Sequence, residues 1–310
     1  ERQNSDDPTF SFQWAVSQAA PARRLNVERT AVFDWYYGWA SGGYVADSYF
    51  AKAAGSYSQQ QYYYRNCYIN DGAYGVNWNE VIQGCVGNTV DTSGMKSLAN
   101  GNGVSDWGDR NATTVIESTP KLREKPFLYF DTEKDEYRVF VPAMKNNYKG
   151  ISWSYNNMGE GTSISVDKYF YIANPDVDTA DSINKQLKAG KNIIFQPGVY
   201  HVDKPIEVKK ANTVLLGLGL ATIIPDNKDS GMKIGNVGGV SVAGLIFDAG
   251  NYSETMLTVG TEGTKKNHEE NPVVLQDVFF RVGGTGHLGR TDSCLVINSD
   301  DTIVDHTWIW

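Results

Sequence analysis

The chain of 310 residues lacks both a long apolar segment and a basic, then apolar, beginning. A membrane-spanning helix needs roughly 18 or more consecutive apolar residues, and no window of the sequence approaches that length. Residues 1–7 are polar and acidic, unlike the start of a signal peptide. We therefore expect no membrane partner, and we expect any export signal to have been removed.

Positive charge and cysteine are also scarce. The chain has 28 Lys and Arg against 36 Asp and Glu, a formal net charge of −8 and an isoelectric point near 5.1. Proteins that bind nucleic acids display clustered Lys and Arg, so nucleic acid is excluded as an expected partner. Cys67, Cys85 and Cys294 are too few for a disulfide scaffold and have no paired C-x-x-C spacing for zinc. No metal site and no cofactor is predicted.

The sequence does contain an internal repeat. Four early segments share an alternating stretch, a polar corner and a second short apolar stretch: 25–33, 44–50, 62–69 and 76–82. Equivalent points recur about every 15 to 20 residues, the length of one turn of a β-solenoid. The pattern returns in three late segments: 240–247, 274–280 and 303–309. The late interval of roughly 30 residues fits coils whose corners carry loop insertions.

The repeat predicts an all-β fold, a right-handed parallel β-helix. An antiparallel sandwich would also show many short strands with turns between them. Such a sandwich needs frequent hairpin turns, and the late region has no Asn-Gly or Asp-Gly pair between two alternating stretches. Asp71-Gly72 is the one early candidate for a tight turn. The repeated strand, corner and strand therefore favour the β-helix.

A short amphipathic helix is predicted near 179–189. Asp178 is interpreted as its N-cap, with an acidic residue three positions later; Ile183 and Leu187 form an apolar i, i+4 pair, and Gly190 ends the helix. Three short β-rich stretches follow: 192–202, 205–208 and 213–217. Because the first coil of a β-helix exposes an open sheet edge, we expect this helix to cap it.

The run TADSINKQLKAGKNIIFQPGVYHVDKPIEV, residues 179–208, resembles the start of the pectate-lyase-like β-helix superfamily. In that superfamily a capping helix leads to an F-x-P-G-x-Y-x-V signature. The run is most similar to the branch of the family 55 glycoside hydrolases, which are β-1,3-glucanases with two β-helices side by side. The resemblance is specific over 175–250, looser over 250–310, and rests on the repeat alone over 24–85. It implies a secreted, extracellular enzyme with inverting acid/base chemistry.

The predicted organisation has three parts. Residues 1–85 are expected to be the terminal coils of a first β-helix, 86–174 a loop and β-hairpin crossover, and 175–310 the capping helix and first coils of a second β-helix. Within the crossover, 86–118 and 145–162 are interpreted as loops and 127–141 as the β-hairpin. Neither end of the sequence carries a cap, so we expect further polypeptide of the same protein to cover both ends. The family's catalytic acid is expected beyond Trp310 and is carried onto no residue.

An acidic cluster supplies the candidate catalytic residues Asp300, Asp301 and Asp305. Neighbouring coils lie about 4.8 Å apart and residues i and i+2 about 6.6 Å apart. Both spacings suit the carboxylate pairs of glycosidases. One protonated Asp would donate to the leaving oxygen while an ionised Asp activates water, with His306 tuning one of them. An Asp at a solenoid corner also accepts backbone N–H bonds, which is the structural alternative. Asp277 is expected near the corresponding corner of an earlier coil.

Aromatic side chains form a second candidate surface. Consecutive strand residues face opposite sides, so the aromatic runs 35–39 and 62–64 cannot all point into the core. Exposed rings on a rigid surface stack on sugar rings. The predicted substrate-binding residues are Trp35, Tyr37, Trp39, Tyr63, His306 and Trp308. Tyr and Trp are also favoured in contacts between domains, which is the other interpretation.

Cys67 and Cys85 are one predicted coil apart. They are expected to stack in neighbouring coils, either as a disulfide or as two buried thiols that act as small hydrophobic groups. Both interpretations stay open at this point.

The leading function is a secreted glycoside hydrolase that acts on a β-glucan-type polysaccharide or oligosaccharide. The first alternative is a polysaccharide lyase or another enzyme that acts on acidic glycans. Such an enzyme needs basic residues to neutralise uronate groups, and the basic residues of this chain are scattered. The second alternative is a non-catalytic adhesin or glycan-binding protein, for which the repeats alone suffice.

Overall fold

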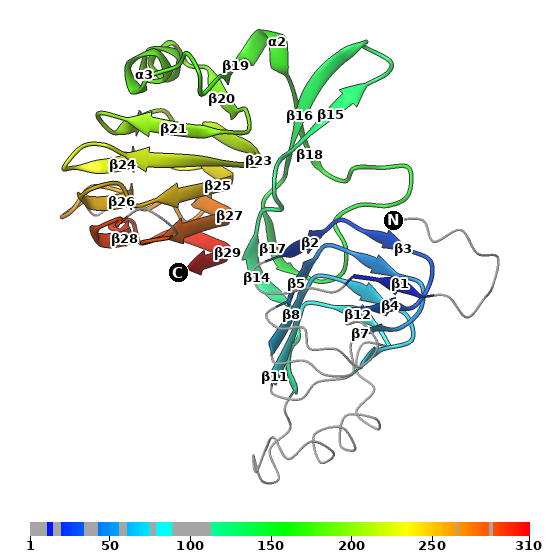
Figure 1. Ribbon diagram of the computed structural model, residues 1–310. Coiled ribbons are helices and arrows are strands. Elements are labelled where there is room, and N and C mark those ends of the chain that lie inside the picture. Colours follow the sequence, from blue (N-terminus) through cyan, green and yellow to red (C-terminus); the bar gives the residue numbers. More distant parts are fainter. Residues whose placement is uncertain are drawn as a thin grey trace. The chain divides into compact units, whose positions relative to one another are not determined.

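The computed structural model describes residues 11–14, 20–33, 43–55, 61–74, 79–88, 113–264, 266–284 and 288–310. The chain divides into a first unit, Glu1–Glu124 with Met144–Glu160, and a second unit, Lys125–Ala143 with Gly161–Trp310. Strands dominate the described residues of both units, and the helices that the structure describes, α2 (Val166–Tyr169) and α3 (Ala180–Ala189), lie in the second (Figure 1). Among the described residues, none of the helices has the length and apolar character needed to span a bilayer.

The first unit consists of short strands in three parallel sheets and one antiparallel pair. Its strands are β1 (Phe12–Gln13), β2 (Pro21–Arg23), β3 (Asn26–Val27), β4 (Ala31–Val32), β5 (Gly43–Ala46), β6 (Tyr49–Phe50), β7 (Ala54–Gly55), β8 (Gln61–Arg65), β9 (Tyr68–Ile69), β10 (Ala73–Tyr74), β11 (Asn79–Gln83), β12 (Val86–Gly87), β13 (Thr113–Ile116), β14 (Thr119–Leu122) and β17 (Lys145–Tyr148). The sheet orders are β1-β4-β7-β10, β13-β11-β8-β5-β2 and β12-β9-β6-β3.

The chain of the first unit visits the three sheets in turn and then returns to the first. For example, β5 pairs in parallel with β2 of the preceding pass and β8 of the following pass. The bonded residues Arg24 and Asp47 are 23 residues apart, and Cys67 and Cys85 are 18 apart. The second interval lies within the predicted repeat of about 15 to 20 residues, and the first is a few residues longer. The parallel pairing rules out the antiparallel sandwich.

The second unit has a seven-stranded parallel sheet, a four-stranded parallel sheet and a three-stranded antiparallel sheet. The largest sheet contains β19 (Phe170–Ala173), β20 (Asn192–Phe195), β21 (Val199–Val202), β23 (Val214–Pro225), β25 (Ser241–Asp248), β27 (Val273–Arg281) and β29 (Thr302–Ile309). The four-stranded sheet is β22 (Ile206–Val208), β24 (Ser230–Ile234), β26 (Ser253–Val259) and β28 (Thr291–Ile297). The antiparallel sheet is β15 (Phe127–Asp131), β16 (Glu136–Pro142) and β18 (Gly161–Ser165), and it leads into α2 (Val166–Tyr169).

A residue in the left-handed (αL) conformation forms the same corner in successive coils of each unit. In the first unit these residues directly follow the strands of one sheet, and in the second they lie inside its long strands. The first αL stack is Arg24, Asp47, Asn66 and Gly84; the second αL stack is Gly219 with Leu220, then Gly244, Asp277 and His306. Gly, Asn and Asp adopt this conformation most readily, which explains their frequency at these corners.

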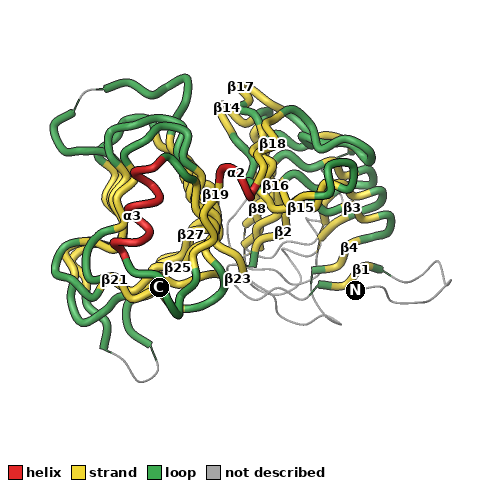
Figure 2. Tube along the Cα trace, turned by 90° about the horizontal axis from the view of Figure 1, so that it is seen from above, coloured by secondary structure: helices red, strands yellow, loops and turns green. Residues whose placement is uncertain are grey.

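The helix predicted near 179–189 is α3 (Ala180–Ala189), and its buried residues belong to the enclosed core of the second unit. Viewed from above, α3 lies within the outline of the stacked strands (Figure 2). Gly190 ends it with φ of 89°, as predicted. The N-cap is Thr179 rather than Asp178, because Thr179 and Ser182 form a reciprocal capping box. The carboxylate of Asp178 instead accepts bonds from Tyr171, Asn174 and Ser182.

The F-x-P-G-x-Y-x-V signature has a packing explanation in the second unit. The rings of Phe195 and Tyr200 meet edge to face with centroids 5.3 Å apart, and both are buried. The Tyr200 hydroxyl donates to the carbonyl oxygens of Ala173 and Gln196. Gly198 has φ of 144°, and a Cβ there would lie 2.5 Å from the ring of Pro175. The signature therefore stabilises the turn between β20 and β21, which follow α3 in the chain.

Two segments interpreted as loops contain strands. Thr113–Ile116 is β13, which pairs in parallel with β11, and Lys145–Tyr148 is β17, which pairs antiparallel with β14. Polar composition hid β17, whose four residues include no aliphatic side chain, and β13 lies at the end of its sheet with Val115 and Ile116 exposed. The hairpin predicted at 127–141 is confirmed by the antiparallel pairing of β15 and β16.

Candidate active site

The second αL stack places an acidic and an imidazole side chain at adjacent corners. Asp277 lies at the bend of β27 and His306 at the bend of β29, and the strands pair in register on both sides of these bends. Their φ angles are 52° and 69°. Non-glycine residues held in this sparsely populated region cluster at functional sites, which makes this corner a candidate site.

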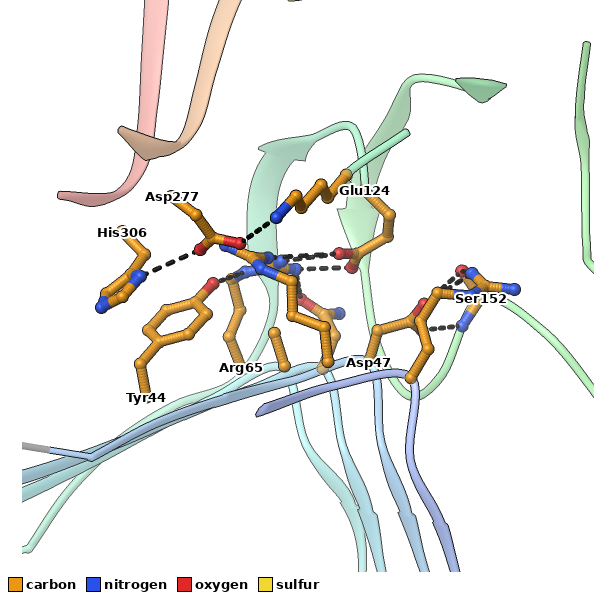
Figure 3. A network of polar contacts seen from close by, with 12 residues as sticks. Tyr44, Asp47, Arg65, Glu124, Ser152, Asp277 and His306 are labelled. Carbon is orange, nitrogen blue, oxygen red and sulfur yellow. Dashed lines mark hydrogen bonds and ion pairs between the residues drawn. The ribbon is translucent and has the colours of Figure 1, made fainter. Parts of the chain in front are cut away.

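Asp277 joins three segments of the second unit (Figure 3). Its side chain is only 1% exposed; Oδ1 lies 2.9 Å from Nδ1 of His306 and Oδ2 accepts a hydrogen bond of 2.8 Å from Nζ of Lys125. An ionised carboxylate only accepts, so Nδ1 of His306 donates to it. The Lys125 ammonium compensates the buried negative charge. The arrangement therefore fixes the orientation of the imidazole.

Phe279 supports the same imidazole from another side. The rings of Phe279 and His306 meet edge to face, with centroids 5.4 Å apart and planes at 82°. Trp308 pairs in register with Phe279. Since the neighbouring Phe280 points into the enclosed core, Phe279 and Trp308 both face outward, where they are half-buried. His306 and the predicted sugar-binding Trp308 thus share one outer face of β29.

Asp305 also lies on the outer side of its sheet. Its register partner is Gln276, which in turn pairs with Ala243. Ala243 belongs to the cluster packed outside the parallel sheet, so the half-buried Asp305 faces the same way. From the coil spacing and strand rise, the Cα atoms of Asp277 and Asp305 lie about 6 Å apart. Asp305 therefore lies beside the bonded pair of Asp277 and His306, on the outer side of the same sheet.

The structure does not bring the other two predicted catalytic residues to this place. Oδ2 of Asp301 accepts the backbone N–H of His268 at 2.7 Å, which is the structural use of a corner Asp. Asp300 is exposed in the preceding turn. The strand rise separates Asp301 from Asp305 by about 13 Å, too far for a glycosidase carboxylate pair. Of the three aspartates, Asp305 alone lies beside the second αL stack, and its catalytic role stays a prediction.

Of the four aromatic residues predicted in the first unit, Trp35, Tyr37 and Trp39 lie outside the described residues. Tyr63 is half-buried, and its hydroxyl donates to Oε1 of Gln83 at 2.5 Å. Its chain neighbours Tyr62 and Tyr64 are buried in the core of the first unit, so the three tyrosines alternate as predicted. Binding of a sugar by Tyr63 stays a prediction.

The first αL stack holds a second buried carboxylate, Asp47. Its side chain has no exposed surface; Oδ1 accepts the backbone N–H of Ser152 at 2.5 Å, and Oδ2 accepts from Ser152 Oγ and Arg24 Nη1, both at 2.8 Å. Burial and the nearby carboxylate of Glu124 raise the pKa of Asp47 to about 7, against the lowering effect of Ser152 and Arg24. Through these contacts Asp47 connects its corner to the segment Met144–Glu160 of the same unit, which contains Ser152.

Arg65 and Glu124 form an ion pair in the interior of the first unit (Figure 3). Two nitrogens of the guanidinium each lie 2.7 Å from a carboxylate oxygen, and the side chains are 4% and 2% exposed. Tyr44 accepts a further bond from Arg65 Nε at 3.0 Å. Such a bidentate ion pair is strong and directional. It holds the side chain of Glu124, the last residue of Glu1–Glu124, in one orientation.

Sequence reasoning missed Lys125 and the direct bond between Asp277 and His306. Lys125 is 152 residues from Asp277, so no local spacing could have joined them. The register of β27 and β29 was the missing information, since it makes Asp277 and His306 neighbours although they are 29 residues apart. In the described ranges, no group of three or more His, Cys, Asp and Glu side chains is arranged to hold a metal ion.

Residues 170–310 match the model of the LAM55 pectate lyase-like domain. The chain is 47% identical over 300 residues to a protein named exo-beta-1,3-glucanase from Streptomyces sp. (strain SirexAA-E / ActE), a match that covers 96% of this chain and 46% of that protein. Two solved structures of sacteLam55A from Streptomyces sp. SirexAA-E, one of them a glutamate-to-alanine variant in complex with glucose, each superpose with a TM-score of 0.85. They are 46% and 47% identical, and the matches cover 97% of this chain and 51% of theirs.

The chain thus spans about half the length of these relatives. The predicted similarity to the pectate-lyase-like, family 55 β-1,3-glucanases is confirmed.

Proposed function

We propose that this chain is part of a glycoside hydrolase that cleaves β-1,3-glucan. The observation that carries the proposal is the 47% identity to an exo-β-1,3-glucanase across 96% of the chain. Identity at this level over both units makes a shared substrate class the simplest explanation. The finer expectations belong to the same proposal: extracellular location, and two right-handed parallel β-helices, one in each unit. The three-sheet winding of the first unit and the parallel sheets of the second support the β-helices.

The outer face around His306 is the proposed glucan-contacting surface of the second unit. Trp308 offers a half-exposed ring for sugar stacking, and Asp305 offers a carboxylate one residue before His306. Asp277 and Lys125 hold the imidazole and take no direct part. In this proposal Asp305 exchanges a proton with the glycosidic oxygen or with the attacking water.

Release of reducing sugar from laminarin tests the proposed function. The whole protein that contains this chain is incubated with laminarin, with cellulose as a neutral glucan of different linkage, and with alginate and pectin as acidic glycans. Release from laminarin alone is the expected result, and glucose as the only early product indicates exo action. Unsaturated uronate from the acidic glycans would favour a lyase, and no product from any glycan would contradict the proposal.

Substitution of Asp305 by Asn tests the assigned proton transfer. If Asp305 is an acid/base residue, kcat on laminarin falls by about 10² to 10⁴ while the fold is kept. The matched control is Asp300→Asn, an exposed aspartate of the same coil, which should leave kcat unchanged. A loss confined to KM in Asp305→Asn would reduce the role of Asp305 to binding.

A further inference from the structure

Cys67 and Cys85 occupy the same position in adjacent coils of the first unit. Each directly follows an αL corner, and the residues after them, Tyr68 and Val86, pair in register. The two Cα atoms therefore lie about 4.8 Å apart, the spacing of neighbouring strands. The backbone N–H of Cys67 points to the sulfur of Cys85 at 3.3 Å. Both side chains contact the enclosed core of this unit.

Ser48 fills the equivalent position in the preceding coil, and its contacts have the same pattern. The N–H of Leu25 donates to the Ser48 hydroxyl at 3.1 Å, as the N–H of Cys67 does to Cys85. Each side chain also points to the carbonyl oxygen two residues earlier, at 2.8 Å for Ser48 and 3.6 Å for both cysteines. The three side chains share one orientation, so the thiols of Cys67 and Cys85 stand directly in line.

We propose that Cys67 and Cys85 form a redox-sensitive pair that closes to a disulfide between adjacent coils. The structure holds both as thiols. Their estimated Cα separation of about 4.8 Å falls within the range of about 4.4 to 6.8 Å that disulfides span. The thiols already stand side by side along the stack, so closure requires side-chain rotation and no exchange of strand partners. This inference does not depend on the proposed glucan hydrolysis.

A small disulfide such as oxidised glutathione supplies the oxidising equivalents. The thiolate of Cys85 attacks one sulfur of the oxidant, its proton passes to solvent, and one glutathione thiolate leaves. The thiolate of Cys67 then attacks the Cys85 sulfur, loses its proton likewise, and displaces the second glutathione. Two thiols are oxidised and one disulfide is reduced to two thiols, so atoms and electrons balance.

Exposure decides which sulfur reacts first. Cys85 is half-buried, whereas the side chain of Cys67 has no exposed surface. Burial raises the pKa of the Cys67 thiol well above its usual value, and the adjacent Cys85 adds to this effect. Cys67 is therefore a poor target for an external oxidant and acts as the second, intramolecular nucleophile. Closure should be slow and should become faster with rising pH.

The test compares the reduced full chain with Cys85→Ser and Cys67→Ser during incubation with oxidised glutathione. Because Ser48 already fits this stack, serine should preserve the fold at both positions, and circular dichroism checks this. In the wild type the thiols of Cys67 and Cys85 should be lost, one peptide should link the two residues with the loss of two hydrogen atoms, and the chain should unfold at a higher temperature. Neither variant should form the link or gain stability.

Several results would overturn the proposal. One is a glutathione that stays on Cys85 while the Cys67 thiol persists. Another is a peptide that links Cys294 to either residue. A third is the survival of both thiols under conditions in which the half-buried Cys294 reacts, since that reaction shows the oxidant to be active.

Discussion

The two αL stacks use one backbone corner for two different purposes. In the first unit, Asp47 and Asn66 bond to Ser152 and Tyr148, which belong to the segment that covers the corner. In the second unit, Asp277 bonds to a lysine and to the imidazole of the next corner, beside half-exposed aromatic rings. The backbone requirement for left-handed φ selects small or polar residues at both stacks. The two stacks differ in what their side chains bond, and only the second belongs to the proposed glucan-contacting surface.

Asp47 and Asp277 sharpen the comparison because their burial and charge pairing are nearly the same. Their side chains are 0% and 1% exposed, and each has a cation at 2.8 Å. The two residues differ in their remaining hydrogen bonds. Asp47 accepts hydrogen bonds from the backbone N–H and the hydroxyl of Ser152, whereas Asp277 accepts one from the imidazole of His306. Substitution at the first site should therefore change stability, and at the second should change both stability and catalysis.

The largest effect is expected from Glu124→Ala in the first unit. Removal of this carboxylate leaves the guanidinium of Arg65 buried without its charge partner, which should cost about 3 to 5 kcal/mol of unfolding free energy. Chemical denaturation measures the loss. Glu117→Ala is the matched control, since Glu117 forms an exposed pair with Lys149 and should change stability little. An equal loss in the two variants would show that burial does not distinguish these pairs.

Asp277→Asn should lower the unfolding free energy less than Glu124→Ala does, and it should lower activity more. Asn tolerates the αL conformation, so the change removes charge while the corner is kept. Loss of a charged hydrogen-bond partner should cost about 1.5 to 3 kcal/mol. A freed imidazole should reduce kcat on laminarin by about 10²-fold, the usual cost of a misplaced group. Asn at Asp47, measured in parallel, should leave kcat unchanged; a loss there as well would remove the functional distinction between the stacks.

The raised pKa of Asp47 predicts a pH dependence of the stability of the first unit. Its value rises from 3.8 to about 7 on folding, so the folded chain holds a proton that the unfolded chain has lost over this range. The contribution of Asp47 to stability is therefore greatest at low pH and declines as pH rises from about 4 to about 7. Unfolding free energies measured at intervals across this range should fall more steeply for the wild type than for Asp47→Asn. Parallel slopes would contradict the raised pKa.

The periodic part of this protein was predictable from sequence, and the sites were not. Period and parallel stacking followed from the repeats, and α3 followed from Ile183, Leu187 and Gly190. The αL positions could not all be predicted from sequence, because Arg24 and Leu220 are residues that rarely adopt the left-handed conformation. Lys125 was also beyond reach, since its partner is set by strand register and not by spacing. The cluster of Asp300, Asp301 and Asp305 failed to assemble because neighbours in sequence spread along an extended strand.

The smallest effect, and the most direct test of the corner itself, is expected at Leu220. This residue has φ of 57° and is 47% exposed, so its side chain contributes little burial while its backbone is strained. Replacement by Gly removes an αL penalty of about 1 to 2 kcal/mol and adds about 0.5 to 1 kcal/mol of unfolded-state entropy. The net result should be a gain in stability of about 1 kcal/mol or less, measurable as a higher denaturation midpoint.

The opposite substitution at the next corner completes this test. Gly244→Ala places a Cβ 2.8 Å from the carbonyl oxygen of Gly217 at φ of 69°, so it should destabilise the second unit. A gain in stability for Leu220→Gly together with a loss for Gly244→Ala would show that the left-handed backbone conformation, rather than a side-chain contact of Leu220, determines which residue is favoured at these corners. Asp277 and His306 would then be polar residues at corners whose backbone conformation favours Gly, Asn or Asp. A loss of stability in Leu220→Gly would instead assign the corner to side-chain packing.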